Sequence, residues 1–569
     1  SRGLFLRAEL LRSVIESPSA GDPAGAFATP DVGAAWPLGR VVERRPANGR
    51  AVDAARQVRV VAVRVADGGG GTFPGMRLGY DMNNMRLFAI DGFGRQLGDL
   101  FDRSAVPLAG VINPLMIEAT AIGRVVVIRS GSLLAAFELS GDPSIPNRRL
   151  WMLNDLSAAA AELPLVNVGR LVGARGGRGT NVPLGMRVAE PDDPNPREEL
   201  HLGPAQATGL PVRVGAAVEL HDPVTGAVIW ERHRVPTNAE LFGDGDFLCI
   251  SPPNGVGATV VSMADGRVIR TADLPPRHQR LAVHGRRIVA IEPLGGEGRQ
   301  FQARVRLVLI DPVTMARQPL GEYRGEALAA GVGGRIVVVE PRGALTLLDL
   351  EQGRVDWTSR IAVGDARPEQ LHVQEWEDRL LVFVGRQPTA EEQAAVSRSG
   401  VVLPLPQSMT GDSQQPATGS VWAVSLRDGS PLWPAPATIL QHALHPQQPP
   451  GLPLLVFARQ IQGQRGGGQT RLSLLALDKR TGHAVCLDDG IEAQQHLLMG
   501  CDVTADPAGH TITLGRGGGE AADRVLEFTG LPIAPRPPYQ AVAVQPPPLD
   551  LRGSLQRLLE RALTPDGGP

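Results

Sequence analysis

A short motif that recurs along the chain limits its fold more than any other feature. Successive copies are "LHDPVTGAVIW" (Leu220 to Trp230), "LLDLEQGRVDW" (Leu347 to Trp357), "AVSLRDGSPLW" (Ala423 to Trp433) and "ALDKRTGHAVC" (Ala476 to Cys486). Apolar residues alternate up to a polar residue, and a glycine follows four positions after it. Because side chains alternate between the two faces of a strand, the motif predicts a strand, a tight turn and a second strand.

The residues of the motif have distinct roles in this interpretation. The carboxylate of Asp222 can accept hydrogen bonds from N–H groups of its own turn, and Pro223 has the φ that a type I turn requires. Gly226 supplies a positive φ, and Trp230 offers a large flat surface for burial against a neighbouring unit. We therefore predict the same structural roles at Asp349, Gly353, Trp357, Gly429, Trp433, Asp478 and Gly482.

The spacing of the motif predicts the architecture. With weaker copies included, the acidic anchors are Asp91, Glu138, Asp222, Asp265, Asp311, Asp349, Asp428 and Asp478, and most steps are 38 to 50 residues. That period is typical of β-propeller blades with four strands each. The chain is therefore expected to be an all-β protein, a β-propeller of eight four-stranded blades with short helical extensions at both ends.

Two steps between anchors are about twice as long, and each contains an insertion. Residues 173–203 and 385–419 are rich in Gly, Pro, Gln and charged residues. Such composition favours long loops on one rim of the ring, and we expect them to be mobile, with few buried side chains.

The two ends of the chain differ from the repeats. Residues 1–50 read as a helical and irregular extension that begins with the amphipathic stretch Leu4 to Ile15, without an initiator methionine, and is expected to continue from a missing upstream region. Residues 51–540 make up the predicted propeller. Residues 541–569 read as a Pro-rich linker and a short amphipathic helix, with Asp550 as its N-cap and leucines along one face.

Composition excludes several classes of function. The formal net charge of −2 gives no electrostatic reason for binding nucleic acid, and no apolar run of 18 residues predicts a transmembrane segment. Three cysteines without a CxxC pair exclude a disulfide framework and zinc-ribbon sites, and buried free thiols are favoured over a Cys486–Cys501 bridge. Lys479 is the single lysine, which a GC-rich bacterial genome explains.

The pattern A-x-D-x-x-x-G-x-x-x-W resembles the tryptophan-docking repeat of the pyrroloquinoline-quinone (PQQ) propellers. The match is good at Asp222/Gly226/Trp230 and at Asp349/Gly353/Trp357, and partial at Ser425/Gly429/Trp433. Segments such as "DGFGRQLG" are also similar to planctomycete proteins known only as PQQ-like repeat proteins. That superfamily includes quinoprotein alcohol dehydrogenases and non-catalytic relatives, among them the lipoprotein of the bacterial outer-membrane β-barrel assembly machine. The resemblance implies that Trp230, Trp357 and Trp433 pack between blades.

The resemblance does not extend to a catalytic centre. Related dehydrogenases use a catalytic aspartate, a Ca²⁺ held by Glu and Asn, and often a pair of adjacent cysteines. No Cys-Cys pair occurs in this sequence, and no segment allows the calcium ligands to be matched one by one. We therefore assign no catalytic, cofactor-binding or metal-binding residue, and expect neither PQQ nor Ca²⁺ as a cofactor.

Other candidate sites have simpler explanations. The pair His442 and His445 in "HALH" could ligate a metal from a helix, but the prolines after it favour a loop. Glycine clusters at 68–71, 176–179, 465–468 and 516–519 lack the Lys-Ser/Thr of a phosphate-binding loop, and "PDDPNP" (191–196) lacks the spacing of a calcium loop. No G-x-S-x-G nucleophile elbow occurs.

These observations favour a non-enzymatic scaffold or binding module of the bacterial periplasm or cell envelope, whose rim loops bind a protein or polymer partner. The alternative is a PQQ- and Ca-dependent dehydrogenase that oxidises alcohols or sugars. A hydrolase or lyase that uses the central pocket is a third hypothesis, for which the sequence offers no residue set.

Overall fold

The computed structural model describes a large part of the chain, and most continuously its middle. The described residues are 40–44, 58–59, 65–67, 76–81, 86–92, 96–101, 117–130, 133–140, 147–153, 183–184, and 200–541 with gaps at 207, 237, 296–302, 364–366, 400, 404–416, 446–447, 463–469, 494–500, 507–508, 517–523, 532 and 534–535. The expected helices at 4–15 and after Asp550 lie outside these residues, as do the clusters at 68–71, 176–179, 191–196 and 465–468 and the glycines at 517–519.

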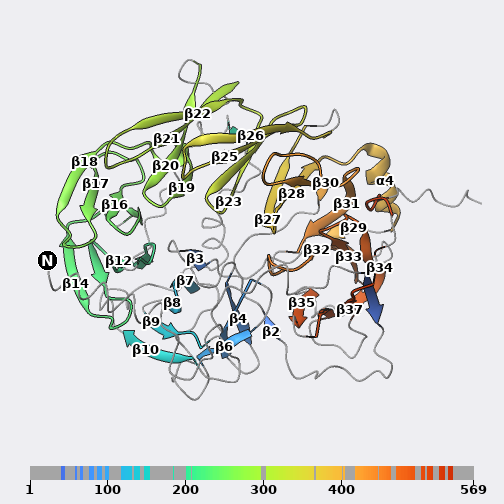
Figure 1. Cartoon of the computed structure of the whole chain (residues 1–569), viewed down its shortest axis with the longest axis horizontal. Helices are drawn as coiled ribbons and strands as arrows, with labels where there is room; N and C mark the ends of the chain where they lie inside the picture. Colours follow the sequence, from blue (N-terminus) through green and yellow to red (C-terminus); the bar gives the residue numbers. More distant parts are fainter. Residues whose placement is uncertain are drawn as a thin grey trace, which may run out of the picture.

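Antiparallel sheets follow one another around a ring, which confirms the predicted β-propeller (Figure 1). Four consecutive sheets are simple four-stranded meanders in chain order. Their strands are β11 (Leu200–Leu202), β12 (Leu210–Val214), β13 (Ala217–His221), β14 (Val228–His233); β15 (Glu240–Gly243), β16 (Phe247–Ser251), β17 (Ala258–Ser262), β18 (Val268–Ala272); β19 (Arg280–His284), β20 (Arg287–Pro293), β21 (Arg304–Ile310), β22 (Arg317–Arg324); and β23 (Leu328–Val332), β24 (Arg335–Val339), β25 (Ala344–Asp349), β26 (Arg354–Arg360).

Two sheets precede these four meanders along the chain. One has the order β2-β4-β5-β6, and the other is the meander β7 to β10 with β3 added in parallel beside β7. Their strands are β2 (Val58–Arg59), β3 (Val65–Asp67), β4 (Arg77–Asp81), β5 (Arg86–Ile90), β6 (Gln96–Phe101), β7 (Ile117–Ile122), β8 (Val125–Ser130), β9 (Leu133–Glu138) and β10 (Arg148–Leu153).

After β26 one continuous sheet takes in the next strands, and β31 links its two halves. The first half of β31 pairs with β30, where Val421 faces Ala437, and its end pairs with β32, where Leu444 faces Phe457. This sheet therefore holds strands enough for two blades, and the number of eight blades stays a prediction. Its strands are β27 (Gln370–Trp376), β28 (Arg379–Arg386), β29 (Val401–Leu403), β30 (Ala417–Ser425), β31 (Ala437–Leu444), β32 (Leu454–Gln462), β33 (Thr470–Asp478) and β34 (Ala484–Ala493).

The last sheet joins the two ends of the ring. It contains β35 (Cys501–Asp506), β36 (Thr511–Arg516), β37 (Arg524–Phe528) and, as its fourth strand, β1 (Val41–Arg44). Val41 lies opposite Phe528 and Arg44 opposite Val525. The ring thus includes a strand that precedes the expected propeller boundary at residue 51, and pairing between distant parts of the chain closes it.

The core lies between successive sheets, because each sheet is covered on both faces. In β25 the four residues from Leu345 to Leu348 are all buried, although their side chains point alternately to opposite faces. One core cluster joins Val289 and Leu307 of one sheet to Ile336 and Leu348 of the next. Burial of such a leucine contributes about 1.5–3 kcal/mol, so packing between the sheets dominates the stability of the ring.

The insertion at 385–419 is more structured than the mobile loop that we expected. Helix α4 (Ala390–Ser399) and strand β29 occupy it, and β29 pairs with the end of β32. Thr389 and Glu392 form a capping box: the Thr389 hydroxyl accepts a bond from the Glu392 amide, and the Glu392 carboxylate accepts one from the Thr389 amide. These reciprocal bonds give the helix a defined start, which explains why the described residues 390–399 are helical.

Only residues 183–184 and 200–203 of the insertion at 173–203 are among the described residues, so the loop expected there stays a prediction. The described part includes β11 and Leu184, whose side chain is fully buried. Leu184 packs in the core between the β19–β22 and β23–β26 sheets, and its amide donates to the Ala327 carbonyl at 3.0 Å. Contact with sheets far along the chain anchors this segment, and local composition carries no sign of such a contact.

We expect Val41→Asp to destabilise the ring by about 2 kcal/mol or more, because Val41 packs against the cluster of Leu526 and Phe528 and an aspartate would bring an unpaired charge there. Urea unfolding of the full chain measures this change. Arg40→Asp is the matched control, since Arg40 is exposed and uses only its backbone in hydrogen bonds to this sheet. Equal stability of the two variants would contradict closure by β1.

Candidate functional site

The predicted turn residues lie at the junction of the third and fourth strands of their sheets. At the β13–β14 turn the Asp222 carboxylate accepts bonds from the Val224 and Thr225 amides at 2.8 and 3.2 Å, and Gly226 has a φ of 72°. Asp349 and Asp478 likewise accept bonds from amides of their own turns. Gly353, Gly429 and Gly482 have φ values of 69°, 72° and 72°.

Two of the acidic anchors are placed differently from the sequence interpretation. The position that Asp222 holds is taken by Ser262 in the β17–β18 turn and by Ser425 in the turn after β30, because Gly266 and Gly429 bond back to the carbonyls of these serines. Each serine hydroxyl accepts an amide two residues on. Asp265 and Asp428 come three residues later and bond amides at the end of the turn. A hydroxyl thus replaces the carboxylate in two of the turns.

Each docking tryptophan packs on the glycine of the next strand-connecting turn of the repeat around the ring. Trp230 lies on Gly266, Trp357 on Gly429 and Trp433 on Gly482, and a Cβ added at these glycines would come within 2.5 to 2.9 Å of the indole. The indole N–H groups of Trp230 and Trp357 donate to the Met263 and Leu426 carbonyls, each at 2.9 Å. The glycine therefore serves both the positive φ of the turn and the close approach of the ring.

Trp151 makes the same contact, and our sequence analysis missed it. Its indole lies on Gly226 and donates to the Pro223 carbonyl at 2.9 Å. Trp151 follows Glu138 by 13 residues, whereas the repeat places the tryptophan eight residues after its anchor, so the regular spacing could not identify it. The available signal was Gly226 in the turn of the next sheet, because a turn glycine of this repeat needs a side chain of the preceding sheet to pack against it.

In the described residues, the β19–β22 sheet packs against each of its two neighbouring sheets without a docking tryptophan. Met315 holds the glycine position of the β21–β22 turn with a φ of 60°, and Gln318 takes the place of a tryptophan against Gly353. Leu184 fills the adjoining core beside Leu320 and Tyr323. An inserted segment therefore covers the junction where the repeat lacks its large side chain.

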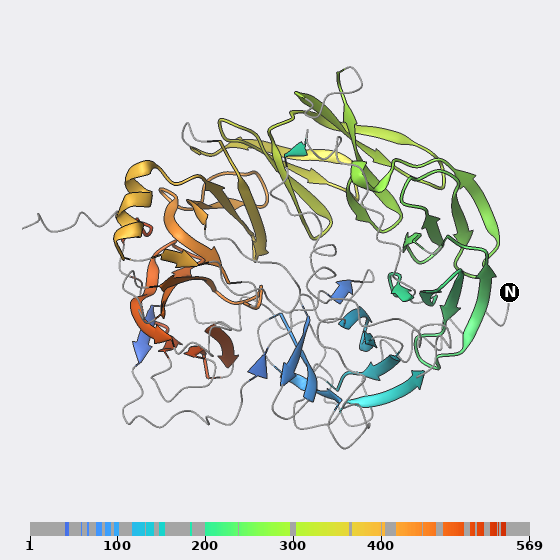
Figure 2. The same ribbon diagram turned by 180° about the vertical axis from the view of Figure 1, so that it is seen from behind.

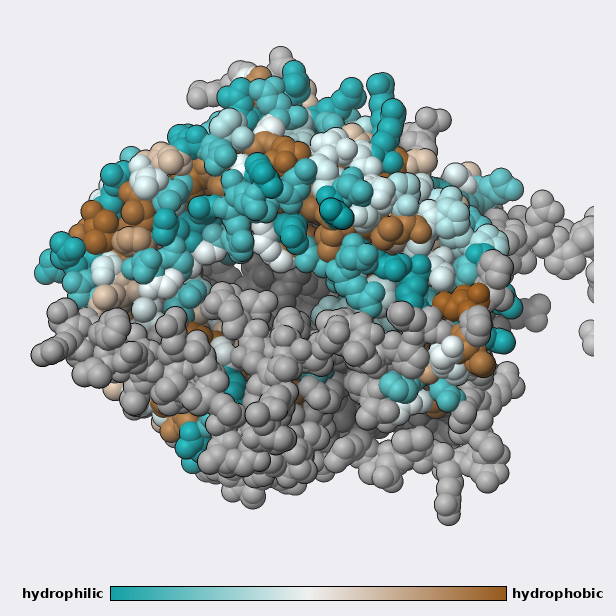
Figure 3. All heavy atoms as spheres, viewed as in Figure 1, coloured by the Kyte–Doolittle hydropathy of each residue, from teal (hydrophilic) through white to brown (hydrophobic). Residues whose placement is uncertain are grey.

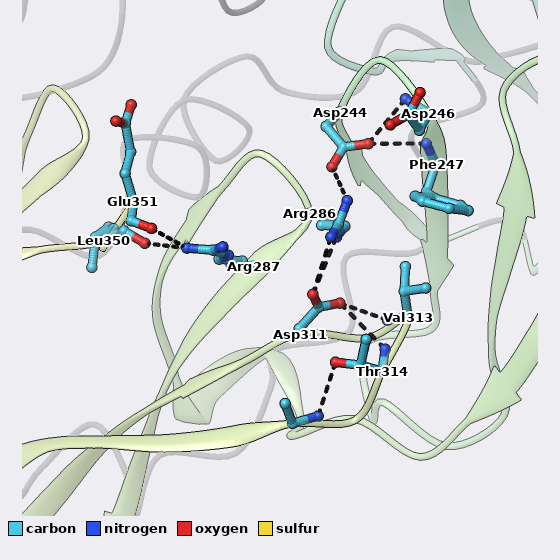
Figure 4. A network of polar contacts seen from close by, with 11 residues as sticks. Asp244, Asp246, Phe247, Arg286, Arg287, Asp311, Val313, Thr314, Leu350 and Glu351 are labelled. Atoms are coloured by element: carbon cyan, nitrogen blue, oxygen red, sulfur yellow. Dashed lines mark hydrogen bonds and ion pairs between the residues drawn. The ribbon is translucent and has the colours of Figure 1, made fainter. Parts of the chain in front are cut away.

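An arginine joins two sheets beside these turns (Figure 4). Arg286 donates to Asp244 of the preceding sheet at 2.8 Å and to Asp311 of its own sheet at 3.2 Å. Partial burial lowers the pKa of Arg286, but bonds and attraction from Asp311 and Asp244 raise it on balance above its ordinary value. Partial burial raises the pKa of Asp311, but the Val313 amide and Arg286 together hold it below its ordinary value. Asp244 and Asp311 thus share the single positive charge of Arg286.

A second arginine in Figure 4 reaches the following sheet. Arg287 donates through one guanidinium nitrogen to the Leu350 and Glu351 carbonyls of the β25–β26 turn, at 2.9 and 2.5 Å. Because Arg286 contacts the preceding sheet and Arg287 the following one, these adjacent residues link three consecutive sheets.

His442 lies in strand β31, not in the loop that we expected, because the prolines come only after His445. One ring nitrogen of His442 bonds the Leu440 carbonyl at 2.8 Å and the other bonds the Ser473 hydroxyl at 2.9 Å. Gln441 beside it has a φ of 48°, at the point where β31 passes from β30 to β32. These contacts give His442 a structural role. Within the described residues no group of three His, Cys, Asp or Glu side chains is placed to hold a metal ion.

Lys479, the single lysine of the chain, is fully buried. Its ammonium donates to the Pro450 carbonyl at 2.8 Å and lies 5.8 Å from the centre of the Trp376 ring. The same carbonyl accepts a bond from Gln374, and the Trp376 indole donates to the Gly451 carbonyl at 3.3 Å. The loop between β31 and β32 is thereby clamped against β27.

Among the described residues, neither the side chains of Cys249 and Cys486 nor the surface indicates a reactive site. Cys249 and Cys486 are buried, and burial raises the pKa of Cys249 to about 12. Polar residues cover much of the described surface in Figure 3, with apolar residues in separate groups. No helix in the described part of the chain is long and apolar enough to cross a membrane.

Helix α4 is the most prominent described element outside the sheets (Figures 1 and 2). It lies at the outer edge of the ring, and the side chains of Ala390, Glu391, Gln393 and Ala394 are exposed. Arg386 at the end of β28 forms a bidentate ion pair with Glu392 at 2.7 and 2.8 Å. This pair and the capping box fix the first turn of the helix on the ring while Glu391 faces solvent.

No family model matches the chain, and no curated protein matches it in sequence. Among solved structures, BamB from Moraxella catarrhalis is 11% identical, with a TM-score of 0.29 over 72% of this chain and 96% of that one. The WD40 domain of SCAP from fission yeast is 7% identical, with a TM-score of 0.35 over 86% and 98%. Apo AztD from Citrobacter koseri is 11% identical, with a TM-score of 0.28 over 60% and 89%. All three are β-propellers, and the likeness is one of fold.

We expect Gly429→Ala to destabilise the protein by about 2–3 kcal/mol, from an unfavourable φ and from a Cβ placed 2.5 Å from the Trp357 ring. Gly257→Ala is the matched control, because Gly257 has a φ of 69° and open space around it, and about 1 kcal/mol is expected there. Thermal and urea unfolding measure both variants. Equal losses would show that the tryptophan contact adds nothing beyond backbone strain.

We expect Arg286→Gln to lower stability at neutral pH by about 1 kcal/mol, since its partners are partly exposed. The folded-state pKa of Asp311 is depressed, so its contribution is present above the ordinary value of 3.8 and is lost as the pH falls through the folded pKa. The difference between wild type and variant should therefore shrink below about pH 4. Urea unfolding from pH 3 to 8 tests this, with the exposed Arg270→Gln as control. A pH-independent difference would contradict the coupling.

Proposed function

We propose that this chain is a non-enzymatic β-propeller scaffold or binding module of the bacterial cell envelope, related to the PQQ-like repeat proteins, that presents its rim to a protein or polymer partner. The proposal rests on the structural role of the repeat residues. Trp230, Trp357 and Trp433 pack on turn glycines, and the turn carboxylates bond their own amides. The motif that resembles quinoproteins therefore builds the ring.

Two observations on the described residues support our expectation that the chain holds no quinone and calcium centre. A planar quinone needs stacking surfaces, but four described tryptophans lie on glycines between sheets, and Trp376 and Trp422 are buried in the core. Ca²⁺ needs several free oxygen ligands, whereas Asp244 and Asp311 share the guanidinium of Arg286. No reaction through either group is therefore assigned to this chain.

Helix α4 supports a role in presentation at the rim. Glu391 in its first turn is exposed, and the bidentate bond between Arg386 and Glu392 holds the helix in a fixed orientation. A helix fixed in this way loses little conformational freedom on binding, which favours affinity. The exposed carboxylate of Glu391 suits a cationic group on a partner.

The full chain, coupled to a resin, should capture a partner from an envelope extract of the source bacterium, and Glu391→Arg/Gln393→Arg should reduce capture at least about fivefold through charge reversal. Both positions are exposed and neither contributes to the Arg386–Glu392 pair. Glu231→Arg on the exposed face of β14 is the matched control. Capture that is unchanged by the helix variant would contradict presentation by α4.

Calorimetric titration of the purified chain with PQQ and Ca²⁺ tests the alternative. We expect neither stoichiometric uptake nor oxidation of primary alcohols. One-to-one uptake with turnover above background would replace the scaffold proposal by the dehydrogenase.

A further inference from the structure

The outer edge of the sheet that contains β30 is interrupted where the other sheets have a full fourth strand. Beyond the isolated bridge between Val424 and Pro431 the chain passes through Trp433, Pro434 and Pro436 before β31 begins at Ala437. Proline has no N–H group to donate, so this stretch cannot complete the ladder. We call the space between this stretch and the β33–β34 turn at Gly482 the groove, because residues of both sides bond one further segment of the chain.

A segment that follows ring closure lies in this groove. We call Arg536–Ala541 the strap; it comes after β37 and belongs to none of the described sheets. The amide of Tyr539 donates to the Gly482 carbonyl at 2.9 Å, and its carbonyl accepts a bond from the Thr438 amide at 2.9 Å. One residue of the strap thus bonds both walls of the groove through its backbone.

Side chains of the strap add specificity to this backbone pairing. Pro538 is buried, and Tyr539 packs against the cluster of Trp433 and Ala437. The Gln540 amide group donates to the Pro436 carbonyl at 2.8 Å. These contacts match an extended Pro-Tyr-Gln sequence position by position.

The ends of the strap are held as well. The Ala541 amide donates to the Thr438 hydroxyl at 2.7 Å, and the His483 ring donates to the Arg536 carbonyl. Backbone bonds combined with pockets for particular side chains are the means by which protein grooves recognise extended peptides. The groove therefore has the donors, acceptors and apolar wall of a peptide site.

We propose that the groove between Pro436–Thr438 and Gly482–His483 is a peptide-recognition site for extended Pro-Tyr-Gln segments, which the chain's own strap occupies and a partner protein with such a segment can take over. The inference rests on the proposed function only in treating the chain as a binding module. Occupancy by a tethered segment at an effective concentration near millimolar would make the site available only to partners that compete with it.

The test uses the full chain with Pro538→Ala/Tyr539→Ala, which weakens the strap and leaves the groove intact. The probe is a fluorescein-labelled peptide of residues 536–541, followed by fluorescence polarisation. We expect saturable binding to this variant with an apparent affinity at least about tenfold above that of wild type, in which the strap competes. The same peptide with alanine in place of Tyr539 should bind at least about tenfold more weakly.

A groove substitution locates the binding. Thr438→Val in the strap variant removes the hydroxyl that accepts the Ala541 amide and should weaken peptide binding, whereas Thr346→Val, whose hydroxyl contacts only Thr358, should not. A strap variant that keeps the wild-type circular dichroism and thermal midpoint but shows no saturable binding overturns the proposal. Such a failure would not affect the capture experiment at α4, so the two proposals fail separately.

Hydrogen exchange on the wild-type chain gives a second measurement should the strap variant lose its fold. A releasable strap predicts that the amides of Tyr539 and Ala541 exchange together and faster than those of β33. Exchange of these amides only as slowly as that of β33 would overturn the proposal, since the strap would then open only with the ring.

Discussion

The packing of an indole on the turn glycine of the next repeat is the contact on which the ring depends. A propeller sheet has two apolar faces and must be covered on both, so its neighbours have to approach at a fixed distance and orientation. Tryptophan supplies a large rigid surface for this, and the glycine allows it to approach the turn backbone. At Gly226, Gly266, Gly429 and Gly482 the same residue also satisfies the positive φ of the turn. The positive φ of the turn and the close approach of the indole thus both require glycine at the same position.

This double requirement explains which parts of the structure local sequence could predict. Asp222, Gly226 and Trp230 belong to one turn and its strand, so their spacing indicates the geometry directly. The all-β propeller follows because the spacing recurs. Ser425 was recognised only as a partial match and Ser262 not at all, because a hydroxyl can accept the same amide bond as a carboxylate.

Other features could not be predicted for different physical reasons. Helix α4 had a local signal, the Thr389–Glu392 capping box before a run of helix-forming residues, but the surrounding Pro and Gln suggested a loop. Leu184 had none, since its partners Leu320 and Ala327 lie more than a hundred residues further along the chain. The strap is a similar case, because its partners Thr438 and Gly482 become an accessible groove only once the ring has formed.

The junctions between sheets also differ in how they are sealed. Where the repeat is complete, side chains of the two sheets suffice. Where it departs from the pattern, at Gln318 or at the prolines before β31, a segment from another part of the chain lies against the junction. A segment from elsewhere in the chain therefore completes the packing between sheets where the repeat residues leave it incomplete.

The burial of Lys479 has a consequence for the chemistry of the whole molecule. It is the single lysine, it is fully buried, and its ammonium bonds the Pro450 carbonyl. The folded chain therefore has no accessible lysine side chain for acylation, reductive methylation or conjugation through an isopeptide bond. Any such modification of Lys479 would require the clamped loop to move first, so this one amine reports on local opening of the ring.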